Sequence, residues 1–256
     1  MAPHLAHLTA LQQLYLEYNA IGDEGARALE RPLSNLTSLH QLYLDNNDIG
    51  AAGVQALAPN LPNLPNLKHL YLSYNRIGSV GAMVLGPRLT SLKCLQQLYL
   101  SNDIGAAGAN ALGPHLTSLQ QLYIDNNMIC TAGAAALGPH LASLMPLQQL
   151  NLSYNCIGNE GARALGPHLC GLMALQEAYR SYNDIGAKAE GRWKRTCPAL
   201  PPCDVYTSRV KRYSSAMLCC QHVQSGAEPC TLNLEFWPNL GYQAHSTRPE
   251  RALQPR

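Results

Sequence analysis

Three histidines are the first side chains in this sequence with the chemistry of a catalytic or metal site. His115, His140 and His168 all occur in the same context, Gly-Pro-His-Leu, so they recur together with a longer repeating unit. A zinc site needs several ligands close together, and neither a carboxylate nor a cysteine accompanies each histidine as a companion ligand. We therefore interpret the three histidines as helix-surface residues that were copied with the unit.

A second group of possible metal ligands lies near the end of the chain. It consists of Cys197, Cys203, Cys219, Cys220 and His222. The gaps between these residues are irregular, and no Cys-x-x-Cys pair faces another pair, so the sequence predicts no metal site. The Gly-x-x-Gly motif that starts at Gly22 lacks the Lys-Ser/Thr of a phosphate loop. No nucleophile stands beside a base. We expect no catalytic, metal or cofactor site, and hence a protein that is not an enzyme.

A row of tyrosines carries the clearest chemical signal. This tyrosine row consists of Tyr15, Tyr43, Tyr71, Tyr99, Tyr123 and Tyr179, and Asn151 takes the sixth of its seven places. Tyrosine offers a large, stiff contact area and a hydroxyl group, and it is enriched where proteins bind one another. We predict that the row, together with the flanking acids Glu17, Asp45 and Asp125, binds a protein partner with a basic surface. The alternative is a row copied from one ancestral unit without a binding role.

The elements that must position the tyrosines come from a unit of 28 residues. Its first leucine recurs at Leu11, Leu39, Leu67, Leu95, Leu119, Leu147 and Leu175, with a single shorter spacing of 24 after Leu95. A period in this range indicates a solenoid, in which each unit buries its apolar face against its neighbours. The fourth unit has lost one residue from the turn Ser101-Asn102-Asp103.

Each unit reads as a strand, a turn, a helix and a loop. Leu42 and Leu44 alternate with polar or aromatic neighbours, which is typical of a strand with one buried face. The pattern predicts parallel strands near residues 13–17, 41–45, 69–73, 97–101, 121–125 and 149–153, stacked in one sheet. Apolar residues then follow at helical spacing. The proline of each Gly-Pro-His-Leu motif predicts that the helix divides into two short pieces, because proline removes a helical hydrogen bond.

An asparagine recurs in the turn that follows each predicted strand. The ladder positions are Asn19, Asn47, Asn75, Asn127, Asn155 and Asn183. A buried turn leaves backbone groups without partners, and an amide side chain can both donate and accept hydrogen bonds. We expect these asparagines to be buried and to satisfy the turns from one coil to the next.

The unit resembles a known repeat. The pattern Leu-x-x-Leu-x-Leu-x-x-Asn-x-Ile-Gly-x-x-Gly-Ala-x-Ala-Leu is similar to the leucine-rich repeat of the ribonuclease-inhibitor type, which also forms the recognition ends of Nod-like receptors and the body of the Ran GTPase-activating protein. The resemblance implies an α/β fold: a right-handed horseshoe with a parallel sheet on its concave face and helices on its convex face. It covers residues 1 to about 190, and one such scaffold serves many partners.

The distribution of charge separates two regions. Residues 1–190 carry 9 Lys and Arg against 12 Asp and Glu, a net charge of −3, whereas residues 191–256 carry 9 against 4, a net charge of +5. We expect about seven repeat units over 1–190, the first half-unit truncated, and a disordered, non-repeat tail over 191–256. The repeat region lacks the basic stripe that nucleic-acid binding requires.

Further expectations concern location and function. No signal peptide and no run of roughly 18 apolar residues is visible, so we predict a cytoplasmic protein that does not bind membranes. The function that we expect is non-enzymatic protein–protein interaction through the concave face. One alternative is a GTPase-activating regulator resembling the Ran regulator, although that family's functional residues cannot be placed here. Another is a gene fragment without independent function, because the chain starts within a unit.

Overall fold

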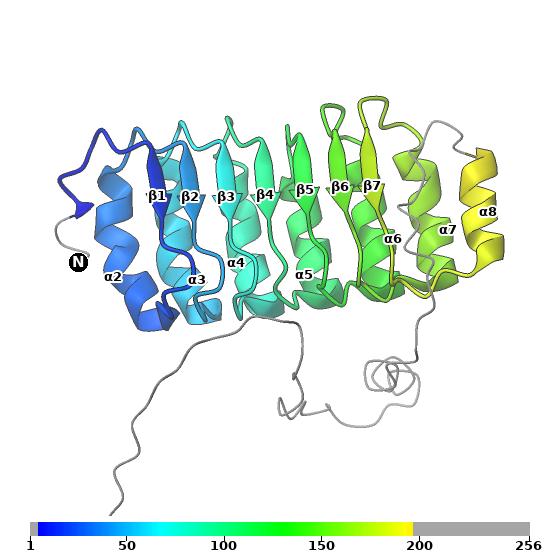
Figure 1. The fold of residues 1–256 in the computed structure, drawn as a ribbon, viewed down its shortest axis with the longest axis horizontal. Helices are drawn as coiled ribbons and strands as arrows, with labels where there is room; N and C mark the ends of the chain where they lie inside the picture. The colour runs from blue at the N-terminus through cyan, green and yellow to red at the C-terminus, as the bar shows by residue number, and fades with distance from the viewer. Residues whose placement is uncertain (1–4, 197–256) are drawn as a thin grey trace, which may run out of the picture. The chain divides into compact units, whose positions relative to one another are not determined.

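Residues 5–196 are described by the computed structural model, and they form seven coils that each start with a short strand (Figure 1). The strands are β1 Gln13–Tyr15, β2 Gln41–Tyr43, β3 His69–Tyr71, β4 Gln97–Tyr99, β5 Gln121–Tyr123, β6 Gln149–Asn151 and β7 Glu177–Tyr179. All pairs are parallel, and the strands follow one another in chain order in a single sheet. This confirms the predicted solenoid. The strands are shorter than expected, but hydrogen bonds continue past their ends, as from Leu16 N–H to Tyr43 O at 3.0 Å.

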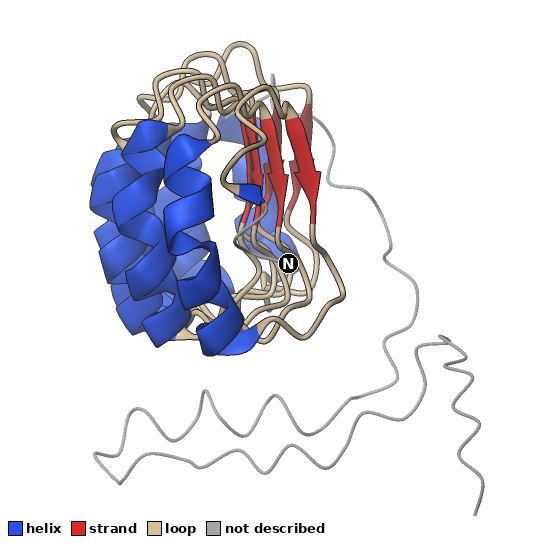
Figure 2. Cartoon of the chain, turned by 90° about the vertical axis from the view of Figure 1, so that its left-hand side faces the viewer, coloured by secondary structure: helices blue, strands red, loops and turns tan. Residues whose placement is uncertain are grey.

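The helices form a second layer on one side of the sheet (Figures 1 and 2). They are α2 Gly22–Asn35, α3 Ala51–Leu57, η1 Ala58–Asn63, α4 Gly78–Leu89, α5 Gly105–Leu112, η2 Gly113–His115, α6 Cys130–Leu141, α7 Gly158–Leu169 and α8 Ala187–Thr196. The opposite side of the sheet, which we call the strand face, carries no helix of the described residues. Because strand side chains alternate, the tyrosines point to the strand face while the leucines point to the helices.

A continuous leucine core fills the space between the two layers. In the second coil Leu42, Leu44 and Ile49 are buried, and Val54 and Leu57 of α3 cover them from the helix side. The equivalent positions are also buried in the third to sixth coils, while Ile21 and Ile185 of the first and last coils are partly buried. The core therefore runs along the solenoid rather than around one centre. Among the described elements, contacts occur only within a coil or between neighbouring coils.

The expected division of the helix at the proline of Gly-Pro-His-Leu holds for Pro114 and is wrong for Pro139 and Pro167. A break occurs in the second coil, between α3 and η1, and in the fourth coil, between α5 and η2. In the first, third, fifth and sixth coils the helix is continuous. The prolines inside these helices are Pro32, Pro87, Pro139 and Pro167. These prolines stand in the last helical turn, where the absent N–H removes one hydrogen bond close to the end of the helix.

The histidines of the Gly-Pro-His-Leu motif pack between coils. A Cβ atom added to Gly113 would lie 2.6 Å from Cδ2 of His140, and one added to Gly138 would lie 2.6 Å from Cδ2 of His168. Each imidazole therefore covers a glycine of the preceding coil and is half-buried rather than fully on the surface. This packing gives the recurrence of the histidines a structural reason.

An asparagine ladder closes the turns at one end of the strands. Asn47 Nδ2 donates to the carbonyl oxygens of Leu16 at 2.8 Å and Leu44 at 3.0 Å, while its Oδ1 accepts from the backbone N–H of Asn19 at 3.0 Å. The backbone N–H of Asn47 in turn donates to Oδ1 of Asn75 at 3.1 Å. Every hydrogen bond of this kind points the same way along the solenoid.

The ladder differs from the expectation at three positions. Asn102 of the shortened fourth coil is a member, since its Oδ1 accepts from Asn75 N–H at 2.8 Å, so the residue lost from that turn is not the ladder asparagine. Asn47, Asn127, Asn155 and Asn183 are buried, but Asn75 is half-buried and Asn19 is exposed. Asn19 belongs to the first described coil, and no earlier strand of the described residues covers it.

The last described helix, α8, extends to Thr196 and so continues past residue 190, where we expected the repeat region to end. The remainder of the expected tail, residues 197–256, lies outside the described residues, as do the cysteines and the histidine considered above as metal ligands.

Candidate functional site

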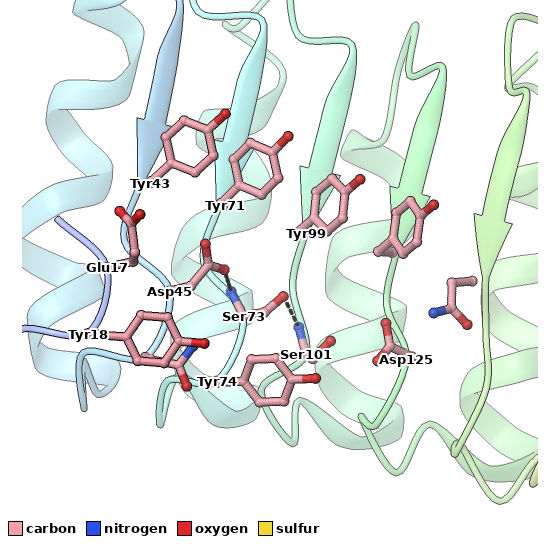
Figure 3. Close-up of a pocket in the computed structure, with 13 residues that line it drawn as sticks. Glu17, Tyr18, Tyr43, Asp45, Tyr71, Ser73, Tyr74, Tyr99, Ser101 and Asp125 are labelled. Atoms are coloured by element: carbon pink, nitrogen blue, oxygen red, sulfur yellow. Dashed lines mark hydrogen bonds between the residues drawn. The ribbon is translucent and has the colours of Figure 1, made fainter. Parts of the chain in front are cut away.

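The tyrosine row forms a stack of rings across five strands of the strand face. The ring centroids of Tyr15, Tyr43, Tyr71, Tyr99 and Tyr123 follow one another at 4.3–4.4 Å, with interplanar angles between 7° and 26°. The in-register pairing of the strands produces this stack, because each tyrosine is opposite the next. Figure 3 shows the rings of Tyr43, Tyr71 and Tyr99 side by side with their hydroxyl groups pointing the same way.

A row of glutamines holds the tyrosine hydroxyl groups. The hydroxyl of Tyr71 donates to Gln97 Oε1 at 2.8 Å, and that of Tyr123 donates to Gln149 Oε1 at 2.9 Å, so these two bonds cross to the next strand. The hydroxyls of Tyr15 and Tyr43 donate to the glutamines of their own strands. Sequence reasoning missed the glutamines, although a residue two positions before a strand tyrosine must share its face. With hydroxyl and ring both held, the tyrosine row is a fixed surface.

The rings of the tyrosine row are only partly exposed. Tyr43, Tyr71 and Tyr99 are half-buried, because each ring covers a face of its neighbours and leaves its edge and hydroxyl accessible. Tyr15 is 54% exposed, since it stacks on one side only within the described residues. Burial is the main reason why the pKa values of the Tyr43 and Tyr99 hydroxyl groups are raised.

The expected acidic residues lie directly beside the tyrosine row. Asp45 Oδ1 accepts a hydrogen bond from Ser73 N–H at 2.7 Å, and Ser73 Oγ accepts from Ser101 N–H at 3.2 Å (Figure 3). Burial raises the pKa of Asp45 to about 6, and the negative charge of Glu17 adds a smaller upward contribution. Burial also raises the pKa of Asp125. In the described part of the chain, Oε2 of Glu17 is covered and has no hydrogen-bond partner.

Four further tyrosines occupy the turns that follow the strands: Tyr18, Tyr74, Tyr154 and Tyr182. Of these, Tyr18 and Tyr74 line the same space as the acids (Figure 3). All four have a positive φ, between 55° and 58°. This left-handed conformation suits glycine or asparagine and is unfavourable for an aromatic residue. Asn46 and Asn126 hold the equivalent place in other coils and have the same conformation. Tyrosine therefore stands at four places where the backbone favours a smaller residue.

Together these rows enclose a shallow hollow of about 430 Å³ on the strand face. It is lined by Glu17, Tyr18, Tyr43, Asp45, Asn46, Tyr71, Ser73, Tyr74, Tyr99, Ser101, Tyr123, Asp125 and Asn151. The structure thus brings together every expected binding residue except Tyr15 and Tyr179, which lie in the row beyond its two ends. The lining includes three carboxylates, and it contains no lysine, arginine or histidine.

Asp45 makes the stability of the fold depend on pH. Because its pKa is raised above the ordinary value of 3.8, the folded protein holds this proton more tightly than the unfolded chain. Asp45 therefore favours folding at low pH and opposes it as the pH rises from about 4 to about 6.

We expect Asp45→Asn to raise the free energy of unfolding at pH 7.5 by about 1 kcal/mol, a value reduced for the partial exposure of the carboxylate. Urea denaturation at pH 4 and pH 7.5 measures the effect, and the gain should vanish at the lower pH. The exposed Glu30→Gln substitution is the control. If the stability of Asp45→Asn depended on pH in the same way as that of the wild type, the raised pKa of Asp45 would be contradicted.

The described residues contain neither a cluster of metal-ligating side chains nor a helix that could span a membrane. No group of three or more histidine, cysteine, aspartate or glutamate side chains is placed to hold a metal ion. None of the described helices has the length and apolar character that crossing a bilayer requires.

Seven parallel strands that alternate with helices define an α/β repeat solenoid with an uncovered strand face. Parts of this solenoid match family models of the leucine-rich repeat. Residues 65–108 match the family model described as "Leucine Rich repeats (2 copies)", and residues 7–29, 35–58 and 143–166 match the model described as "Leucine Rich repeat". Leucine-rich-repeat proteins are generally non-enzymatic modules for protein interaction. No curated protein matches the chain.

Several solved structures are similar to this chain. Actin-Binding Site 2 of Leiomodin-1 has 12% sequence identity and a TM-score of 0.45, over 77% of this chain and 95% of that chain. An internalin from Listeria monocytogenes has 20% identity and a TM-score of 0.44, over 80% and 63%. A leucine-rich-repeat protein of Leptospira interrogans has 20% identity and a TM-score of 0.41, over 77% and 61%. This chain thus spans less than two thirds of the last two proteins.

Proposed function

We propose that this protein is a non-enzymatic interaction module that binds a protein partner on its concave strand face. The observation that carries the proposal is the stack of tyrosine rings, fixed by glutamines, along an acidic hollow. Binding surfaces of this composition owe much of their affinity to a few aromatic residues. Rings that are already held in place lose little further freedom when a partner binds.

The charge of the hollow supports a partner with a basic surface. Glu17, Asp45 and Asp125 face the same space, and the lining residues provide no cation to neutralise them. The salt bridge between Arg76 and Asp48 lies outside this lining. A basic partner would relieve the repulsion between the acids and orient the encounter.

The positive φ of the tyrosines in the turns argues against a surface that was merely copied. A tyrosine in the left-handed region costs stability, and Asn46 and Asn126 provide a cheaper residue at equivalent places. Tyr18, Tyr74, Tyr154 and Tyr182 therefore support a role that outweighs this cost. The resemblance to the ribonuclease-inhibitor type, and to the recognition ends of Nod-like receptors, favours the same function. No observation on the described residues favours a GTPase-activating role.

The proposal is tested with a triple variant, Tyr43→Ala, Tyr71→Ala and Tyr99→Ala, of the full chain. The immobilised wild type and the variant are each exposed to a cell extract, and the bound proteins are compared by quantitative mass spectrometry. We expect the affinity for a captured partner to fall by more than about 2 kcal/mol in the variant, because the centre of the stack is removed.

A variant on the helix side provides the matched control. Arg27 and Arg31 are exposed on α2, so Arg27→Ala with Arg31→Ala should leave binding unchanged. Circular dichroism checks that both variants are folded. Loss of the partner in the helix-side variant, with binding retained in the folded triple variant, would move the binding surface to the convex side.

A further inference from the structure

The tyrosine row is interrupted at one place. Tyr123 of β5 is paired in register with Asn151 of β6, and Asn151 is paired with Tyr179 of β7. The other six strands of the sheet carry tyrosine at this position. The interruption coincides with the end of the acidic hollow, because Tyr123, Asp125 and Asn151 all line it.

The interruption leaves room for one flat group beside Tyr123. Neighbouring strands lie about 4.8 Å apart, and successive rings of the stack are separated by 4.3–4.4 Å. A planar group above Asn151 would therefore sit at stacking distance from the ring of Tyr123. The ring of Tyr123 is already oriented for this contact, since it lies within 7° of the plane of Tyr99 and its hydroxyl is held by Gln149.

Asn151 itself leaves this space open to a ligand. Its Oδ1 accepts a hydrogen bond from the backbone N–H of Ser153 at 3.0 Å, which ties the short side chain to its own strand. A tyrosine at this place would extend over the same position as the rings of the neighbouring strands. The substitution of asparagine for tyrosine thus converts one position of the stack into a slot.

The surroundings of the slot are negatively charged. Asp125 stands two residues beyond Tyr123, just past the end of β5, and Glu177 of β7 accepts a hydrogen bond from the Tyr179 hydroxyl at 2.8 Å. Burial raises the pKa of Tyr123, and the charges of Glu177 and Asp125 raise it further, so both carboxylates act on the ring from opposite sides of Asn151. The charge favours a cation, and the described residues hold no group suited to a metal ion.

We propose that the slot above Asn151 binds an arginine side chain of the partner protein, with its guanidinium group stacked on Tyr123 and paired with Asp125. This inference rests on the proposed function and names the chemistry that the strand face recognises. A guanidinium group is flat, permanently charged and able to stack on an aromatic face, whereas an ammonium group is a compact point charge. Arginine is therefore the natural side chain that meets both the shape and the charge of the slot.

The rest of the hollow accommodates the chain that carries this arginine. The lining runs from Glu17 of the first coil to Asn151 of the sixth, and further carboxylates occur along it at Asp45 and Asp125. A segment that crosses the strands in an extended conformation can bring successive basic residues to these acids. We therefore assign the hollow to an extended, arginine-bearing segment of a protein.

The test uses three labelled peptides with the full chain. Their sequences are four repeats of Arg-Ser, of Lys-Ser and of citrulline-Ser, and fluorescence anisotropy gives the dissociation constants. Citrulline keeps the shape of arginine without its charge, and lysine keeps the charge without the flat group. We expect the wild type to bind the arginine peptide about tenfold more tightly than the lysine peptide, and to bind the citrulline peptide weakest.

The decisive variant is Asn151→Tyr, which fills the slot with the residue that the equivalent strands already carry and is therefore compatible with the fold. It should remove the preference for arginine over lysine. Asp125→Asn should weaken both basic peptides about equally. A preference for arginine that persists in Asn151→Tyr, or its absence from the wild type, would overturn the inference.

The outcomes separate this inference from the proposed function. If Asn151→Tyr changes nothing while the triple tyrosine variant loses its protein partner, the slot is refuted and the interaction surface stands. If no variant of the strand face alters partner capture, the proposed function fails as well. The free protein could also self-associate and be converted to monomers by the arginine peptide. That result would assign the hollow to a second copy of this chain and would overturn the inference.

Discussion

Replacing Asn155 with alanine is expected to lower the free energy of unfolding by about 3 kcal/mol, because a buried amide that serves two coils disappears. Asn155 is fully buried. Its Nδ2 donates to Ile124 O at 2.8 Å and Leu152 O at 3.0 Å, and its Oδ1 accepts from Asn127 N–H at 3.1 Å. Alanine would leave these backbone groups buried without partners. Guanidinium denaturation followed by circular dichroism measures the loss.

The exposed end of the same ladder supplies the control. Asn19 donates to Leu16 O and Glu17 O, but its side chain is exposed, so water can replace these bonds in Asn19→Ala. We expect that variant to lose less than about 1 kcal/mol. Equal losses at the two positions would show that burial of the ladder does not determine its contribution.

A second large effect is expected at a glycine where two neighbouring helices approach each other closely. A Cβ atom on Gly133 of α6 would lie 2.6 Å from Ile129 Cγ2 and 3.0 Å from the backbone Cα of Ala106 in α5. Gly133→Leu must therefore push α6 away from α5 and disturb the core between two coils. We expect a loss of about 3 kcal/mol, at the upper end of the usual cost of overpacking. Thermal and urea denaturation both report it.

Gly171 is the matched control for this substitution. It is exposed, and the nearest atom to its added Cβ would be His168 O at 3.9 Å. Gly171→Leu should change the free energy of unfolding by no more than about 0.5 kcal/mol. A Gly133→Leu variant as stable as Gly171→Leu would mean that the helices of neighbouring coils can separate freely.

The order of the strands in the sheet was predictable because the 28-residue repeat determines it. Leucines at a fixed interval place every strand opposite the same strand of the next coil, which yields the parallel order and the register of Tyr43 with Tyr71. The helix boundaries were not predictable to the same degree. Whether a proline divides a helix depends on how that helix packs on its neighbours: Pro59 and Pro114 stand at divisions, whereas Pro87 does not.

The candidate site was predictable in its residues but less so in its geometry. Alternation alone brings Tyr43, Tyr71 and Asp45 to one face. It cannot show that the rings lie flat against one another, because that depends on side-chain rotations and on the glutamines that hold the hydroxyl groups. Asn102 was missed for a different reason: deletion of one residue shifted the turn, and only its hydrogen bonds identify it as a ladder member.

The restriction of contacts to neighbouring coils determines how such a protein can change in evolution. Duplication of one 28-residue unit lengthens the strand face by about 4.8 Å and adds one ring to the stack, while the remaining coils keep their partners. A single codon change that exchanges tyrosine and asparagine, as at Asn151, opens or closes a slot without altering the backbone. Length and specificity can therefore vary independently, the first by recombination and the second by point mutation.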